Sequence, residues 1–232
     1  MKSGRLTALI LAAFAVSMLS SCAAKEPQAS ARSGTSWGAE ELIASARSFA
    51  DMSQSEQARS KARDLAERGI EASERCLMLA PEEPGCYYWR AVNTGLYHKV
   101  HVIGYQRGVK RMIEDCKKVV EIDPRYDHAG AYRILGELYT RLPQTGGNVD
   151  SVTRDLNLAE KYLREAVRIA PDYPENYILL AEALLAQDNF KETAEAISSA
   201  ERLAPHWKND VSYKGWQSQI LALEKKVGRG RK

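Results

Sequence analysis

A segment that recurs after 34 residues constrains the fold of this chain more than any other feature. Pro171 and Pro205 end the closely similar sequences R-I-A-P and R-L-A-P. Before each proline, apolar residues recur at the spacing of a helical face, at 159, 163 and 166 and then at 194, 197 and 200. Proline lacks an N–H and its ring clashes with the preceding turn, so each helix must end there. A repeated helix pair cannot bury its apolar face alone, which predicts a stack of pairs.

One first helix carries a more specific signature. Tyr132, Leu135, Gly136 and Tyr139 follow the spacing W-x2-L-G-x2-Y, with tyrosine in the tryptophan position. This pattern resembles the tetratricopeptide repeat, and the resemblance covers about residues 53–205. It implies an all-α fold, a tetratricopeptide-type superhelix of antiparallel helix pairs. In such pairs a residue as small as Gly136 lets two helix axes approach to roughly 8–10 Å.

The spacing of the other prolines indicates two insertions. Pro81, Pro124 and Pro171 lie 43 and 47 residues apart, so the second and third repeats exceed the 34-residue period. By the pattern, the extra residues fall between the first and second helices of their pairs, around His98–Arg107 and around Leu142–Arg154. Insertions on one edge of a helical array often mark a binding face, although two tolerated loops would give the same pattern.

We expect four repeats and a capping helix. In the first repeat, the second helix should run from about Ser53 to Leu79. In the capping helix, Trp216, Ile220 and Leu223 form a narrow apolar stripe. The expected segments are 37–81, 82–124, 125–171 and 172–205 for the repeats, about 210–227 for the capping helix and 228–232 for a basic tail.

The first 21 residues are expected to be a signal peptide rather than part of the fold. Lys2 and Arg5 precede an apolar stretch of 14 residues, from Leu6 to Leu19, which is too short to span a bilayer core. The sequence L-S-S-C that follows resembles the bacterial lipobox. The resemblance implies a lipid anchor on Cys22, with 22–36 as a flexible tether, whereas an ordinary cleaved signal would need no cysteine. No aspartate follows Cys22, which favours a cell-envelope lipoprotein that faces the periplasm from the outer membrane.

Charge and motif content exclude several classes of function. Without residues 1–21 the chain has 31 basic and 30 acidic residues, which is no footprint for nucleic acid. Nucleophile-elbow, P-loop, zincin and dinucleotide-binding motifs are missing, so neither an enzyme nor a cofactor is expected. His98 and His101 share a helix face, but two histidines without a nearby cysteine or carboxylate are weak grounds for a metal site. The sequence does not predict an oligomeric state.

Three cysteines remain after Cys22. Cys76 ends one expected helix and Cys86 begins the next across a short turn, so a disulfide between them is conceivable in an oxidising compartment. Alternatively, Cys76 and Cys116 are small residues of the apolar core.

The tetratricopeptide resemblance implies that first helices line a concave groove that binds a peptide or a helix of a protein partner. The groove would be apolar in the second repeat, charged in the third and mixed in the fourth. The alternative for Tyr88 and Ile178 is a place in the core. The expected groove residues are Tyr88, Val92, Leu96, Arg133, Glu137, Arg141, Ile178, Glu182 and Leu185.

A closer resemblance implies a more specific function, and one further alternative remains beside it. The expected helix break near Gly104 and the sequence from Ile122 to Gly147 are similar to the T component of tetratricopeptide-associated TRAP transporters, mainly over residues 123–185. Those lipoproteins assemble around a periplasmic substrate-binding protein and carry a channel for a small hydrophobic ligand, so this resemblance implies both partners. An outer-membrane assembly or pilus-biogenesis lipoprotein of the same architecture is the other alternative.

Overall fold

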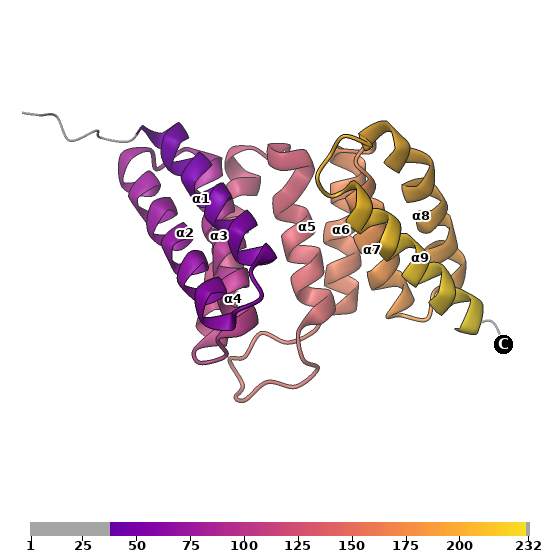
Figure 1. Ribbon diagram of the computed structural model, residues 1–232. Helices are drawn as coiled ribbons and strands as arrows, with labels where there is room; N and C mark the ends of the chain where they lie inside the picture. Colours follow the sequence, from indigo (N-terminus) through magenta and orange to yellow (C-terminus); the bar gives the residue numbers. More distant parts are fainter. Residues whose placement is uncertain (1–37, 231–232) are drawn as a thin grey trace, which may run out of the picture. The chain divides into compact units, whose positions relative to one another are not determined.

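The computed structural model describes residues 38–230, and within this range all regular structure is helical (Figure 1). The elements are α1 (Ala39–Ser55), α2 (Arg59–Leu79), α3 (Pro84–Val100), α4 (Tyr105–Ile122), α5 (Tyr126–Arg141), α6 (Leu156–Ile169), α7 (Pro174–Leu185), α8 (Phe190–Leu203), a 3-10 turn η1 (Ala204–Trp207) and α9 (Tyr213–Gly230).

The helices form four antiparallel pairs that stack in chain order. The pairs are α1 with α2, α3 with α4, α5 with α6, and α7 with α8. The first helices also contact one another in sequence, from α1 through α3 and α5 to α7, so they form one continuous side of the array (Figure 1). Helix α9 packs on both α7 and α8 and covers the end of the last pair with Trp216, Ile220 and Leu223.

Local sequence explains where the helices begin and end. Helices α3 and α7 each start with a proline, whose missing N–H would have no helical partner at that position. Side chains cap two second helices, where Asp155 accepts from the Leu158 N–H at 2.9 Å and Asn189 accepts from the Glu192 N–H at 3.4 Å.

Small residues set the distance between paired helices. A Cβ atom on Gly136 of α5 would lie 2.3 Å from Cγ of Leu163 of α6, a separation that atoms cannot occupy. Leu163 is fully buried, and Leu135 beside the glycine is 1% exposed. The glycine therefore allows α5 and α6 to pack at the separation that the repeat pattern predicts.

The structure corrects the boundary between the first two helices. Ser53, expected to start the second helix, lies in the last turn of α1, and its buried hydroxyl donates to the Ala62 carbonyl at 2.8 Å. Helix α2 begins only at Arg59. No glycine or proline interrupts residues 39–55, so α1 continues until the short turn at 56–58.

The two insertions differ in form. The residues around His98–Arg107 are mostly helical, because they lengthen α3 and α4 and leave only a turn at 101–104. The second insertion is a loop between α5 and α6, covering 142–155. Figure 1 shows the turn and the loop at the same edge of the array. In residues 38–230, no helix combines the length and the apolar character that crossing a bilayer requires.

Candidate functional site

The structure divides the nine expected groove residues into a buried and an accessible set. Ile178 is 0% exposed, Arg133 5% and Tyr88 6%. The alternative for Tyr88 and Ile178, a place in the core, is therefore correct, and the expectation that Arg133 lines an open groove is wrong. The six accessible residues are Val92, Leu96, Glu137, Arg141, Glu182 and Leu185.

Arg133 is buried because it is bonded within the chain. Its guanidinium donates to the Asp127 carboxylate at 2.7 Å and to the backbone carbonyls of Asp127 and His128 at 2.8 and 2.7 Å. Its Nε lies 3.3 Å from a carboxylate oxygen of Glu175 on α7. The hydroxyl of Tyr88, on α3, donates to the Asp127 carboxylate. Arg133 and Asp127 together therefore connect three successive first helices, and the bonded guanidinium is not available to a partner.

These bonds hold a stretch of left-handed backbone at the start of α5. The φ angles of Asp127, His128 and Ala129 are 48°, 56° and 65°, and none of the three is glycine. Each such residue costs about 1–3 kcal/mol and persists only where surrounding contacts fix it. The Arg133 donors satisfy two of the carbonyls, and the His128 ring stacks on Tyr173 with centroids 4.4 Å apart.

Burial and charge act in opposite directions on this cluster. Burial raises the pKa of Glu175, and the Arg133 guanidinium only partly lowers it again. Burial alone would lower the pKa of Arg133, but Tyr88, Glu175 and Asp127 keep that pKa raised above its ordinary value. Arg133 therefore stays a cation, and its role is to fix the packing of α3, α5 and α7.

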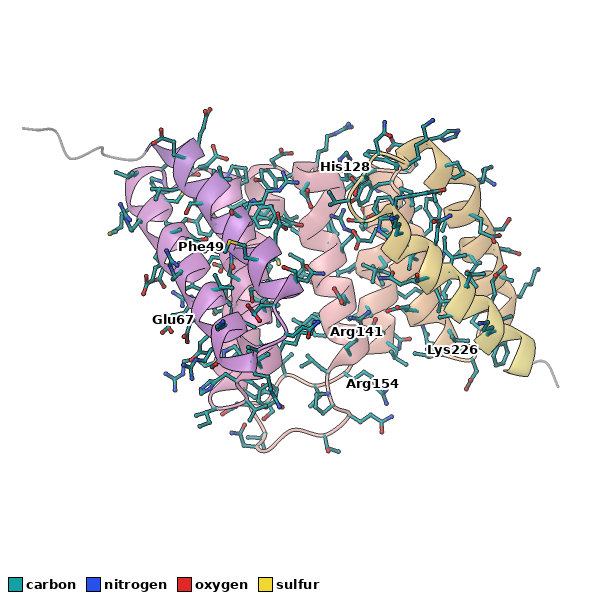
Figure 2. All side chains as sticks on the ribbon, in the orientation of Figure 1. Phe49, Glu67, His128, Arg141, Arg154 and Lys226 are labelled. Atoms are coloured by element: carbon teal, nitrogen blue, oxygen red, sulfur yellow. A yellow bond between two sulfur atoms is a disulfide. The ribbon has the colours of Figure 1, made fainter. Side chains whose placement is uncertain are left out.

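The accessible residues form what we call the first-helix face: Val92 and Leu96 of α3, Glu137 and Arg141 of α5, and Glu182 and Leu185 of α7. Arg141 forms an ion pair with Glu137 one turn earlier and, at 2.8 Å, with Glu182 on the neighbouring helix. Two carboxylates thus share one guanidinium, which leaves an excess negative charge. Figure 2 shows Arg141 at the end of α5 opposite to His128.

Aliphatic side chains of α3 and α7 lie on the helices next to α5, which carries Glu137 and Arg141. Val92, Leu96 and Leu185 are each half-buried, so part of their surface is open to contact. An excess negative charge next to exposed aliphatic surface is suited to an amphipathic segment with a basic residue.

The inserted loop is fixed to the second pair. The side chain of Gln106, in the first turn of α4, donates to the Val152 carbonyl at 3.0 Å and accepts from the Val152 N–H at 2.8 Å. Leu142, where the loop begins, is buried. The second insertion therefore packs on the first one and does not swing freely, an arrangement that the repeat pattern did not predict.

A cavity of about 310 Å³ opens between α4, α5 and α6. Its floor is apolar and aromatic, and Lys117 and Lys161 stand at its rim. Sequence reasoning missed this site because its lysines have the spacing of ordinary surface charges. The lining residues are Lys117, Val120, Tyr132, Leu135, Lys161, Tyr162 and Glu165.

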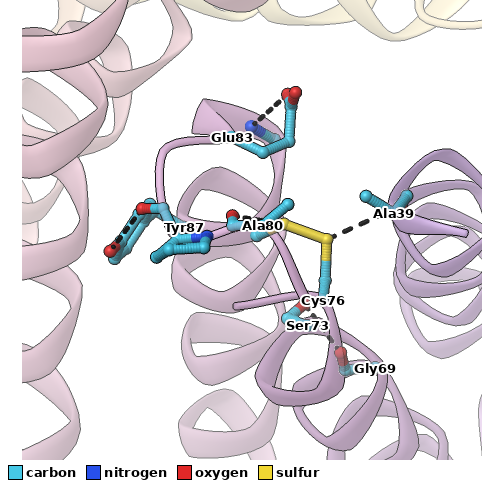
Figure 3. Close-up of a disulfide and its surroundings, with 10 residues drawn as sticks. Ala39, Gly69, Ser73, Cys76, Ala80, Glu83 and Tyr87 are labelled. Carbon is cyan, nitrogen blue, oxygen red and sulfur yellow. Dashed lines mark hydrogen bonds between the residues drawn. A yellow bond between two sulfur atoms is a disulfide. The ribbon is translucent and has the colours of Figure 1, made fainter. Parts of the chain in front are cut away.

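The structure shows the bonding state of the three cysteines in the described residues. A disulfide joins Cys76 of α2 to Cys86 of α3, with Cα atoms 5.5 Å apart (Figure 3). Cys116 is a free thiol with no exposed surface, and burial raises its pKa. Of the two alternatives, the Cys76–Cys86 bond is thus present, and Cys116 is the small core residue.

His98 and His101 contact each other at the end of α3. His98 Nδ1 lies 3.0 Å from the His101 carbonyl oxygen and closes the end of α3. Among residues 38–230 no three histidine, cysteine or carboxylate side chains gather as metal ligands would.

Comparisons with known proteins concern the fold alone. No protein-family model matches the chain, and no curated protein matches it. Its structure is similar to TTC0263, a thermophilic tetratricopeptide (TPR) protein of Thermus thermophilus, with 19% identity and a TM-score of 0.50 over 78% of this chain and 89% of that one. It is also similar to MamA (41-end) from Desulfovibrio magneticus RS-1, with 16% identity and a TM-score of 0.45 over 81% and 95%. The predicted fold class, an all-α array of antiparallel helix pairs, is confirmed by the helices and by the first of these likenesses.

Proposed function

We propose that this chain is a membrane-tethered scaffold that binds a protein partner on its first-helix face. The observation that carries the proposal is the shared ion pairing of Arg141. Two carboxylates on adjacent helices meet one guanidinium, and aliphatic side chains of α3 and α7 lie on the helices to either side. A basic amphipathic segment of the partner would satisfy the excess negative charge and cover the aliphatic surface.

The tether in this proposal is a lipid on Cys22, which lies outside the described residues. Its support is the lipobox-like sequence after an apolar stretch. The Cys76–Cys86 disulfide also supports export, because such bonds persist in oxidising compartments such as the periplasm. We place the chain at the outer membrane, facing the periplasm. Replacing Cys22 with Ser should release it from membranes washed with high salt and change its mature mass, and an unchanged fraction and mass would rule out the anchor.

Charge reversal tests the first-helix face. In cells, a chemical cross-linker should capture a partner with the wild-type chain and lose it with Glu137→Lys/Glu182→Lys, which replaces the excess negative charge by a positive one. Glu195→Lys is the matched control, since Glu195 is an exposed glutamate on α8. Melting temperatures of the variants should agree within a few degrees. Recovery of the same partner from the double variant would exclude this face.

A small hydrophobic ligand is a second candidate, favoured by the cavity between α4, α5 and α6. The aromatic floor and the two rim lysines suit an apolar molecule with an anionic group. This function agrees with the TRAP-transporter resemblance, with a periplasmic substrate-binding protein as partner. It predicts that a fluorescent aromatic carboxylate binds the chain and that Tyr162→Ala weakens its binding while Tyr177→Ala does not.

The identity of the captured partner separates these functions from the third one. A substrate-binding protein or a TRAP permease would favour the transport accessory role. A component of outer-membrane assembly or of a pilus would favour the biogenesis role, and genes of either kind beside this one would point the same way.

A further inference from the structure

The turn between α3 and α4 exposes two aliphatic side chains at its tip. Val102 is 72% exposed and Ile103 76%, although both are β-branched residues that are usually buried. The turn that carries Val102 and Ile103 lies at one end of the α3–α4 pair, at the edge where the 142–155 loop also lies (Figure 1).

The turn holds this tip in a fixed conformation. Gly104 has a φ of +73°, which a side chain would disfavour, and the Tyr105 N–H donates to the Val102 carbonyl at 3.2 Å. The ring of His98 occupies the space where Gly108 has no side chain, since a Cβ there would lie 2.1 Å from that ring. The aliphatic tip is therefore built on two packed helix ends.

The sequence on either side of the tip is basic and aromatic. Residues 98–110 contain Lys99, Arg107 and Lys110 and no acidic residue. In the described part of the chain none of the three cations is within ion-pair distance of a carboxylate. Tyr97 and Tyr105, half-buried, flank the turn on either side. An aliphatic tip flanked by aromatic and cationic residues is typical of a surface that enters a bilayer interface.

The opposite end of α3 has the reverse charge. Met78 and Leu79, at the end of α2, are also exposed, at 76% and 60%, but Glu82 and Glu83 follow Leu79 within four residues. An anionic membrane would repel that end and attract the 101–104 turn. Exposed aliphatic residues thus occur at both ends, and the sequence that flanks them is acidic at one end and basic at the other.

We propose that the 101–104 turn inserts Val102 and Ile103 into the interface of a bilayer that contains anionic lipids. The turn then acts as a second membrane contact, separate from the lipid on Cys22, and fixes how the first-helix face is presented. A protein contact would more commonly be centred on tryptophan, tyrosine or arginine in a pocket than on two aliphatic residues at a tip. This second membrane contact goes beyond the proposed function, and it does not depend on which protein partner binds.

Chain length allows both contacts at once. Cys22 and Gly38 are sixteen residue steps apart along the chain, a distance of at most about 55 Å when extended. Helix α1 has 17 residues and is therefore about 25 Å long. The segment before α1 is long enough to pass the whole length of a helix pair and reach a membrane at its other end.

The experiment removes the lipid so that only the turn is tested. A chain that begins at residue 22 and carries Cys22→Ser is sedimented with vesicles of phosphatidylcholine, alone or with a third of phosphatidylglycerol. We expect at least tenfold stronger binding to the anionic vesicles, weakening as salt is added. Val102→Ser/Ile103→Ser should lower this binding at least tenfold, and Lys99→Gln/Arg107→Gln should lower it only on anionic vesicles.

Two controls keep the result specific. Met78→Ser/Leu79→Ser removes equally exposed aliphatic residues from the other end and should bind vesicles within twofold of the wild-type chain. Glu137→Lys/Glu182→Lys should lose the protein partner but still bind vesicles, so the two proposals can fail separately. Absence of vesicle binding, or equal binding by Val102→Ser/Ile103→Ser, would overturn the proposal. Loss of a protein cross-link from that variant, without any vesicle binding, would make the tip a protein contact instead.

Discussion

Arg133 donates hydrogen bonds to both the carboxylate and the backbone carbonyl of Asp127, six residues before it in the same helix. This contact holds the left-handed start of α5 against its own backbone strain. It also explains why an arginine at a position that the repeat pattern assigns to a groove is not available to a partner.

Replacing Arg133 with Met should therefore destabilise the whole array. The change leaves Asp127 and Glu175 without their counter-charge, and losses of this kind are about 3–5 kcal/mol for fully buried pairs. Both carboxylates keep about a third of their exposure, so we expect a value near the lower end. Chemical denaturation would measure it. Arg141→Met, on the exposed end of α5, is the control and should change the unfolding free energy by less than about 1 kcal/mol; equal effects would contradict the assigned role.

Gly136→Ala should destabilise the chain, although alanine normally favours a helix over glycine. The new Cβ would overlap the buried Leu163 side chain, and overpacking of this kind costs about 1–3 kcal/mol. Gly215→Ala in α9 meets open space and should instead gain about 0.5–1 kcal/mol. Leu135→Ala, which opens the core beside the glycine, should cost about 2–5 kcal/mol. Thermal unfolding of the three variants would show whether the order holds.

The thiols should respond in a defined order. In the folded chain with Cys22→Ser, Cys116 should not react with a thiol reagent near pH 8, because burial raises its pKa and excludes the reagent. Unfolding without a reductant should expose one thiol, and unfolding after reduction should expose three. Counting three thiols without reduction would mean that the Cys76–Cys86 bond is absent in the purified protein.

Gln106→Ala should free the inserted loop without unfolding the helices. The substitution removes both hydrogen bonds to Val152, so amides of the loop near Asn148 should exchange faster and a protease should cut there sooner. Gln219→Ala, at an exposed position on α9, is the matched control. Unchanged exchange in the loop would mean that Leu142 alone holds it.

The sequence predicted the features that repeat and missed those that occur once. Proline spacing and small residues such as Gly136 predicted the pairing of helices, since every repeat solves the same packing problem. The left-handed backbone of Asp127 to Ala129 has no such signal, because none of its residues is glycine. That left-handed turn surrounds the Arg133 side chain with hydrogen-bond acceptors and buries it. The repeat register does not contain this information, so it predicted Arg133 as a groove residue.

The same limit applies to the site. Glu137, Arg141 and Glu182 were predicted as accessible because they occupy the repeat positions that face the groove, but the sharing of Arg141 by carboxylates from two helices depends on how α5 and α7 pack. Tyr88 and Ile178 were equally compatible with a groove and with the core, and only the packing of neighbouring pairs decides between the two.

The disulfide makes the first end of the array harder to open than the last. Arrays of stacked pairs ordinarily loosen from both ends, since a terminal pair has one neighbour instead of two. The Cys76–Cys86 bond is a second covalent link between the end of α2 and the start of α3, beside the backbone turn at 80–83, so the two pairs cannot separate at that point while the bond is intact. The other end has only the apolar stripe of α9 to close it. Disassembly should therefore start at the carboxyl end, and reduction of the disulfide would remove this covalent difference between the ends.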